Sequence, residues 1–144
     1  MRIKIIHMKS EINQTWHFNA PPSEVWDYLT KPELMEKWLM KNDFKPVPGH
    51  KFYFTSPNGC EHYCEVLEVN SFSRLSYSWQ KKSDNDGKPF NSIVVWTLSA
   101  TENGTELNLL HHGFVAIEDF IAHEKGWNFL VDKLKLEYFS SVHK

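Results

Sequence analysis

His111 is the residue of this sequence that is best placed to do chemistry, because it falls within an apolar pattern. The segment Thr105–His112 alternates as a strand does, which puts Leu107, Leu109 and His111 on one face. An imidazole in an apolar cavity could orient the polar end of a ligand, or act as an acid or base near neutral pH. The alternative is a core histidine whose nitrogens are satisfied by a carbonyl or hydroxyl. His112 is predicted to face the surface.

The two cysteines frame a histidine, a spacing that raises the question of a metal site. In an extended segment, Cys60, His62 and Cys64 share one face, with successive side chains about 6.6 Å apart. Zinc ligands lie only about 2.0–2.3 Å from the metal, so three such side chains in a row cannot converge on one ion. We therefore predict two reduced, packed thiols and no bound metal.

Three further motifs fail on spacing. The pair His123-Glu124 lacks the second histidine, four residues on, that a zinc-protease helix requires. The run 84–87 resembles a calcium loop, but no glutamate closes it, so a hairpin turn is predicted. Glu68 is a weaker candidate, an inward carboxylate that pairs with a polar group, with a role in ligand binding as the less favoured alternative. No nucleophile elbow or phosphate-binding glycine loop is visible, and we predict no catalytic residues and no cofactor.

Composition excludes several partner classes. The 144 residues carry a net charge of −2 and no basic stripe, which argues against nucleic acid. The longest apolar run, Ile93 to Trp96, is far too short for membrane insertion. The first seven residues contain no long apolar stretch and no cleavage site, so a cytoplasmic location is expected. We expect one domain over 1–144, in which 1–9 are irregular or extend the first strand.

A strand and two short helices are predicted first. Glu11–Phe18 alternates as a strand, and Pro22 is a good helix start, because the first turn of a helix does not need the N–H that proline lacks. That helix is expected to run to about Leu29. The sequence Thr30-Lys31-Pro32-Glu33 fits a capping box, with Thr30 as the N-cap of a second helix. Trp26 and Trp38 are expected to anchor these helices to the sheet.

Five more strands and a long helix complete the pattern. A loop is expected over 42–49, and the strands that follow it are predicted at about 51–55, 62–70, 74–79, 94–99 and 105–112. From about Ile117 to Val142 the apolar positions recur with helical spacing, interrupted only by Gly126. The sequence thus predicts a two-layer α+β domain in which a curved, six-stranded antiparallel sheet wraps around the C-terminal helix.

A set of short motifs resembles the START-like (SRPBCC) superfamily, in the branch named after the C-terminal domain of the activator of heat-shock protein 90 ATPase. Two positions depart from the family pattern, Cys64 and His50, where glycines are usual. The motifs, from about residue 10 to 140, are Phe18 to Trp26, Leu29 to Glu33 with Trp38, Pro48-Gly49 with Phe52 to Phe54, Val66 to Val69 with Arg74-Leu75 and Trp79, Trp96 to Leu98, Gly104 to Leu107, His111 to Phe114, and Gly126-Trp127.

The resemblance implies the helix-grip (START-like, Bet v-like) fold, in the order β-α-α-β5-α, with a cavity between sheet and C-terminal helix. Aromatic residues make up 15% of the chain and suit either the core or the wall of such a cavity. The candidate ligand-binding residues are Phe52, Phe54, Tyr77, Trp79, Trp96, Leu109, His111, Trp127 and Val131. For each of them, a plain core position is the alternative.

Three functions remain open at this stage. The first is non-catalytic binding of a hydrophobic or aromatic small molecule or lipid, as a carrier or sensor. The second is a protein-binding, co-chaperone-like module that contacts a chaperone; the activator itself uses two domains for this, and the resemblance covers one. The third is a cyclase- or hydrolase-like enzyme that uses His111 as base. We predict the first.

Overall fold

The computed structural model describes residues 11–81 and 90–139, without the side chains of Lys81 and Phe90. The predicted turn over 84–87 lies outside these residues. The elements in chain order are β1 (Glu11–Phe18), α1 (Pro22–Thr30), α2 (Pro32–Trp38), β2 (Lys41–Asn42), β3 (Lys51–Thr55), β4 (Glu61–Asn70), β5 (Arg74–Lys81), β6 (Phe90–Thr101), β7 (Gly104–His112) and α3 (Ile117–Tyr138).

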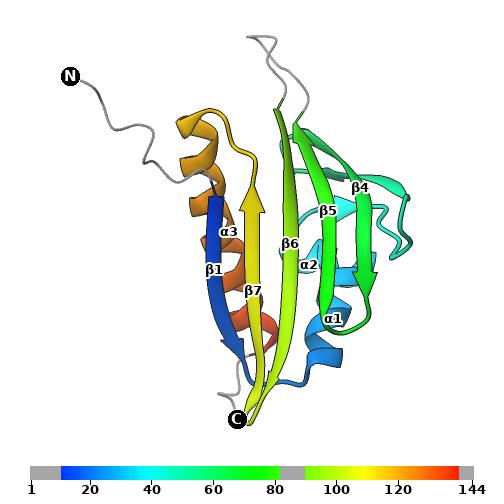
Figure 1. Cartoon of the computed structure of the whole chain (residues 1–144), viewed down its shortest axis with the longest axis vertical. Coiled ribbons are helices and arrows are strands. Elements are labelled where there is room, and N and C mark those ends of the chain that lie inside the picture. Colours follow the sequence, from blue (N-terminus) through cyan, green and yellow to red (C-terminus); the bar gives the residue numbers. More distant parts are fainter. Residues whose placement is uncertain (1–10, 82–89, 140–144) are drawn as a thin grey trace, which may run out of the picture.

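The strands form one antiparallel sheet in the order β1-β7-β6-β5-β4-β3-β2, and α3 runs along one face of it (Figure 1). The α+β helix-grip architecture is confirmed, but the sheet has seven strands where six were predicted. The additional strand, β2, consists of Lys41 and Asn42, paired with Thr55 and Phe54. Two residues are too few to show an alternating pattern, which is why the sequence indicated only a loop there.

The predicted alternation of the central strands is confirmed. Along β5 the side chains of Leu75, Tyr77 and Trp79 are buried, and along β7 those of Leu107, Leu109 and His111 are buried. Neighbouring strands are aligned so that Trp96 of β6 lies opposite both Leu75 and Leu109. One face of the sheet therefore forms a continuous aromatic and aliphatic layer under the helices.

The capping box at Thr30 is wrong. Thr30 is the last residue of α1, and its hydroxyl donates a hydrogen bond to the carbonyl of Trp26, four residues back, at 2.8 Å. Lys31 is instead the N-cap of α2, without a side-chain cap. The reason is Pro32, which disfavours helical geometry in the residue before it, so that the chain breaks at Lys31. Proline at the first position then starts α2.

The long helix α3 ends at Tyr138, with Phe139 as its C-cap, and the predicted extension to Val142 reaches outside the described residues. Trp127, Val131 and Leu134 are its buried residues and face the sheet as predicted. No helix in the described ranges is long and apolar enough to cross a bilayer.

The loop after β2 covers the edge of the sheet. The Asn42 side chain accepts a hydrogen bond from the backbone N–H of Phe44, which turns the chain so that Phe44 is buried in the core. Its ring packs edge-on against Phe52 at a centroid distance of 5.0 Å. The next contact is made by Asp43, whose carboxylate accepts the backbone N–H of Tyr53 on β3 at 3.0 Å.

Candidate ligand-binding pocket

A pocket of about 240 Å³ lies between α3 and the first residues of β4, next to β5. Its wall contains aromatic, sulfur-bearing and small side chains, and no acidic residue, lysine or arginine among the residues that the structure describes. The lining residues are Met40, Cys60, His62, Trp79, Ala122, His123, Gly126, Trp127 and Leu130.

Gly126 is the reason that α3 does not close the pocket. A methyl group placed on Gly126 would meet no atom within 4 Å, so this position of the helix faces open space. Glycine inside a helix costs about 1 kcal/mol relative to alanine. The helix therefore carries a destabilising residue at the point where a side chain would occupy the pocket.

Indole and imidazole rings form the inner wall. Trp79 of β5 and Trp127 of α3 meet across the interface with ring centroids 5.4 Å apart. The ring of His62 also stacks on the indole of Trp79, at 4.8 Å with an interplanar angle of 25°. Trp79 and Trp127 are each only 2% exposed, so a small part of each indole borders the pocket.

The polar atoms of this wall face protein partners. The indole N–H of Trp79 donates to Nε2 of His123 at 3.2 Å. Nδ1 of His123 lies 2.8 Å from the carbonyl oxygen of Asp119, one turn earlier in α3. Since Nε2 accepts a proton and Nδ1 faces an acceptor, these contacts fit the neutral Nδ1–H tautomer. The hydrogen-bonding atoms of Trp79 thus contribute to folding.

His111 lies behind this wall and is completely buried. Its Nδ1 accepts the indole N–H of Trp127 at 2.9 Å, and its Nε2 lies 2.8 Å from the hydroxyl oxygen of Ser92. Because that hydroxyl already donates to the carbonyl of Trp79 at 2.8 Å, it accepts from Nε2–H of His111. Both ring nitrogens of the neutral imidazole are satisfied by the protein.

The surroundings of His111 also keep it uncharged. Burial is the main cause that lowers its pKa from 6.5 to about 2, and the neighbouring His123, His112 and His62 lower it further. A group with such a pKa does not exchange protons with a substrate near neutral pH. The geometry therefore favours the core-histidine interpretation over an acid–base role.

Of the nine candidate residues, Trp79 and Trp127 line the pocket, and His111 lies behind it, in contact with the lining rings of Trp79, His123 and Trp127. The remaining six are buried in the core and are not among the pocket's lining residues: Phe52, Phe54, Tyr77, Trp96, Leu109 and Val131. Tyr77 illustrates their role, because its hydroxyl accepts the indole N–H of Trp96 at 3.0 Å and burial raises its pKa. A ligand role for these six stays a prediction.

The two thiols are free, as predicted, but they differ in environment. Cys64 is buried, and its burial, followed by the nearby Asp43, raises the pKa of its thiol. Cys60 is half-buried and lines the pocket. Three imidazoles surround Trp79, yet no group of three side chains within 11–81 and 90–139 is arranged to hold a metal ion.

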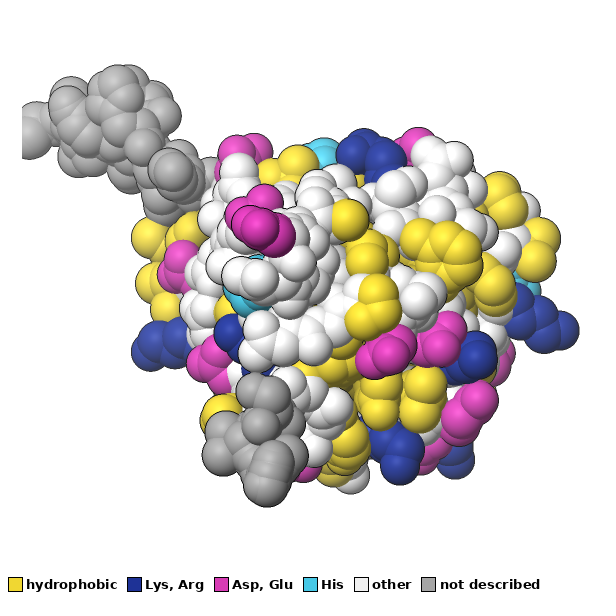
Figure 2. Space-filling view, turned by 90° about the horizontal axis from the view of Figure 1, so that it is seen from below, with side chains coloured by type: hydrophobic (Ala, Val, Ile, Leu, Met, Phe, Trp, Pro, Cys, Tyr) yellow, Lys and Arg dark blue, Asp and Glu magenta, His cyan; other side chains and the backbone are white. Residues whose placement is uncertain are grey.

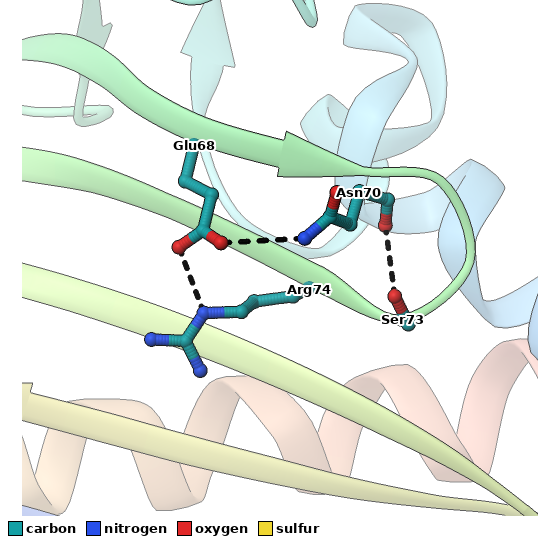
Figure 3. Close-up of polar contacts among 4 residues, drawn as sticks. All are labelled: Glu68, Asn70, Ser73 and Arg74. Carbon is teal, nitrogen blue, oxygen red and sulfur yellow. Dashed lines mark hydrogen bonds and ion pairs between the residues drawn. The ribbon is translucent and has the colours of Figure 1, made fainter.

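Glu68 lies at the surface, not in the cavity. Its carboxylate pairs with Nε of Arg74 at 2.8 Å and accepts a hydrogen bond from the Asn70 amide at 3.3 Å (Figure 3). A register shift between Val66 and Glu68 interrupts the alternation of β4 and accounts for its position. The interpretation of Glu68 as an inward carboxylate is therefore wrong.

The remaining lining residues lacked a sequence signal strong enough to single them out. Met40 precedes the two-residue strand β2, and Cys60 ends the turn before β4. His123 precedes Trp127 by one helical turn, which is the spacing of a shared face. Together with the lone glycine inside a helical pattern, that pair was the one available signal for the pocket.

The match to known proteins accords with this architecture. The model of the family "Activator of Hsp90 ATPase homolog 1-like protein" matches residues 19–138. The chain belongs to this family. No curated protein matches it significantly.

Several solved structures share the fold of this chain over most of its length. Protein MLL2253 from Mesorhizobium loti is 34% identical, with a TM-score of 0.83 over 88% of this chain and 94% of the other. Protein BH1534 from Bacillus halodurans is 29% identical, with a TM-score of 0.72 over the same shares. The Aha1 dimer from Colwellia psychrerythraea is 18% identical, with a TM-score of 0.76 over 92% and 98%, and shows likeness of fold alone.

Proposed function

We propose that this protein binds a small apolar or aromatic molecule, without transforming it, in the pocket between α3 and strands β4 and β5. The observation that carries this proposal is Gly126, a helix-interior glycine that faces open space in a wall of indole and imidazole rings. An unfilled apolar hollow forfeits the free energy that side chains would gain by filling it, about 25 cal/mol per Å². A ligand that covers these surfaces recovers it.

The size of the pocket limits the ligand. A volume of about 240 Å³ lies below the range of roughly 300–1,000 Å³ that is typical of sites for drug-sized molecules. This supports a guest with one ring or two fused rings, not a long lipid chain buried along its whole length.

The experiment is a binding titration with a panel of neutral one- and two-ring aromatics, such as naphthalene, indole and toluene. Gly126→Met places a side chain in the pocket and should abolish binding while the protein stays folded. Lys125→Met is the matched control, because Lys125 is the adjacent, exposed residue of α3. Equal affinities for the wild type and Gly126→Met, or no binding of any panel member, would overturn the proposal.

A protein-binding role, as in a co-chaperone, is the second candidate. It is supported by large apolar side chains that α3 and its preceding loop leave exposed, among them Val115 at 84%, Phe129 at 70% and Leu136 at 73%. A pull-down with the Hsp90-type chaperone and a measurement of the chaperone's ATPase rate test this role. Phe129→Ser with Leu136→Ser should lower any effect, and no association by the wild type counts against it.

A further inference from the structure

A second hollow adjoins the aromatic pocket. It has a volume of about 540 Å³ and lies between the end of α2, the β3–β4 turn and the middle of α3. Met40 and Leu130 line both hollows and therefore form a shared wall between them. The residues that line this outer groove are Glu36, Trp38, Leu39, Met40, Lys41, Thr55, Ser56, Pro57, Phe129, Leu130 and Lys133.

The two hollows differ in charge. Among the described residues, the aromatic pocket is lined by no lysine, arginine or carboxylate, whereas the outer groove is lined by Lys41, Lys133 and Glu36. The ion pairs in that part of the chain are Asp27–Lys31 and Glu68–Arg74, so neither lysine of the groove forms a direct ion pair with a carboxylate. With two cations against one anion, the groove favours an anionic group.

The shared wall is made of side chains that can move aside. Met40 and Leu130 are half-buried, and methionine has three rotatable bonds and no branch. A ligand that spans both hollows would have to pass Met40 and Leu130. Such a ligand would use the aromatic pocket and the cationic groove as two parts of one amphiphilic site.

We infer that the ligand is an amphiphilic carboxylate, with its apolar end in the aromatic pocket and its carboxylate in the groove between Lys41 and Lys133. This inference rests on the proposed function and adds the charge and the polarity of the ligand. The aromatic residues that line the pocket, among them Trp79 and Trp127, favour an aryl end over an acyl end, and the spacer passes Met40 and Leu130.

The test compares ω-phenylalkanoates with three to eight chain carbons against the ω-phenylalkanols of equal length, by calorimetry at low and high salt. Octanoate and octanol, which end in an alkyl chain in place of the phenyl ring, form what we call the acyl arm. The carboxylates should bind about fivefold more tightly than the alcohols, as two exposed ion pairs allow, and the advantage should shrink in salt. In Lys41→Gln/Lys133→Gln the advantage should disappear while the alcohols bind unchanged.

The matched control is Lys45→Gln/Lys125→Gln, which removes the same charge from lysines that line neither hollow. It should keep most of the carboxylate preference. If the alcohols bind as tightly as the carboxylates, or if both double variants lower the preference equally, the inference is overturned and the proposed function stands. Stronger binding of the acyl arm overturns the aryl assignment. If neither arm binds, the inference is overturned, and the separate titration with naphthalene, indole and toluene decides whether the proposed function fails with it.

Discussion

The indole N–H of Trp127 donates to Nδ1 of His111 at 2.9 Å and joins helix α3 to strand β7. The connection continues from Nε2 of His111 to the hydroxyl of Ser92 and from there to the carbonyl of Trp79. Buried hydrogen bonds therefore link four elements, α3, β7, β6 and β5. Removing one partner would leave a buried donor or acceptor unsatisfied, which destabilises the folded protein.

Titration of His111 should make stability depend on pH. The pKa is lowered to about 2 in the folded protein and is near 6.5 in the unfolded chain. Between these two pH values the unfolded chain binds more protons at His111 than the folded protein does. The contribution of a neutral His111 to the free energy of unfolding is therefore complete above pH 6.5 and is lost as the pH falls toward 2. The slope is at most about 1.4 kcal/mol per pH unit. Urea unfolding from pH 7.5 to 5 measures it.

His111→Gln is the variant that isolates this effect, because glutamine does not titrate. Its slope between pH 7.5 and 5 should be shallower than that of the wild type, whatever its absolute stability. His17→Gln removes an exposed histidine and should retain the full slope. Parallel curves for the wild type and His111→Gln would show that His111 is protonated equally in both states.

Tyr77→Phe should destabilise the protein by about 1–3 kcal/mol, because it leaves the buried indole N–H of Trp96 without its acceptor. Tyr53→Phe is the control, since Tyr53 is exposed and should change stability by less than about 0.5 kcal/mol. Chemical unfolding measures both. If Tyr77→Phe also weakens ligand binding under conditions in which the variant is fully folded, Tyr77 contacts the ligand directly.

Gly104→Ala should be more destabilising than Gly59→Ala, although both glycines have positive φ angles. A methyl group on Gly104 would overlap the carbonyl oxygen of Phe18, a backbone atom that cannot turn away, whereas one on Gly59 meets nothing within 4 Å. We expect about 1–2 kcal/mol for Gly59→Ala, from conformation alone, and more than about 3 kcal/mol for Gly104→Ala. Equal thermal shifts would contradict this.

Thiol labelling should distinguish the two cysteines. Cys60 lines the pocket and should react with an alkylating reagent in the folded protein, whereas Cys64 is buried and should react on unfolding. Mass spectrometry of the native protein is therefore expected to show one modified residue. A bound aromatic ligand should slow the reaction of Cys60, and Cys60→Ser should remove the native-state signal. Rapid double labelling would mean that β4 opens readily.

Much of the fold was predictable because side chains of a half-buried strand alternate and those of a surface helix recur every 3.6 residues. That rule placed Trp79, Trp96 and Trp127 on inward faces. It could not place β2, whose two residues are too few to show an alternating pattern, and it failed at Glu68, where a bulge resets the alternation. The error at Thr30 had a local cause, the proline two residues on.

The candidate site was harder to predict, because alternation separates inward from outward positions but does not separate core from cavity wall. Phe54 and Trp79 fit the same pattern and are almost equally buried, yet the indole alone borders the pocket. What distinguishes them is the path of the irregular segments next to Trp79, which contain the lining residues Met40, before β2, and Cys60, at the end of the β3–β4 turn. Those positions depend on tertiary packing.

The hydrogen bond between Asp43 and the backbone of Tyr53 bears on how copies of this protein meet one another. An open sheet margin can recruit a strand from a neighbouring molecule, the first step toward fibrils. At the β2 edge of this sheet, the side chain of Asp43 already accepts the N–H of Tyr53, and the edge strand β2 has only two residues. The other edge strand, β1, is longer, with eight residues. Strand-to-strand association through β1 would thus produce a dimer and not an open-ended fibril.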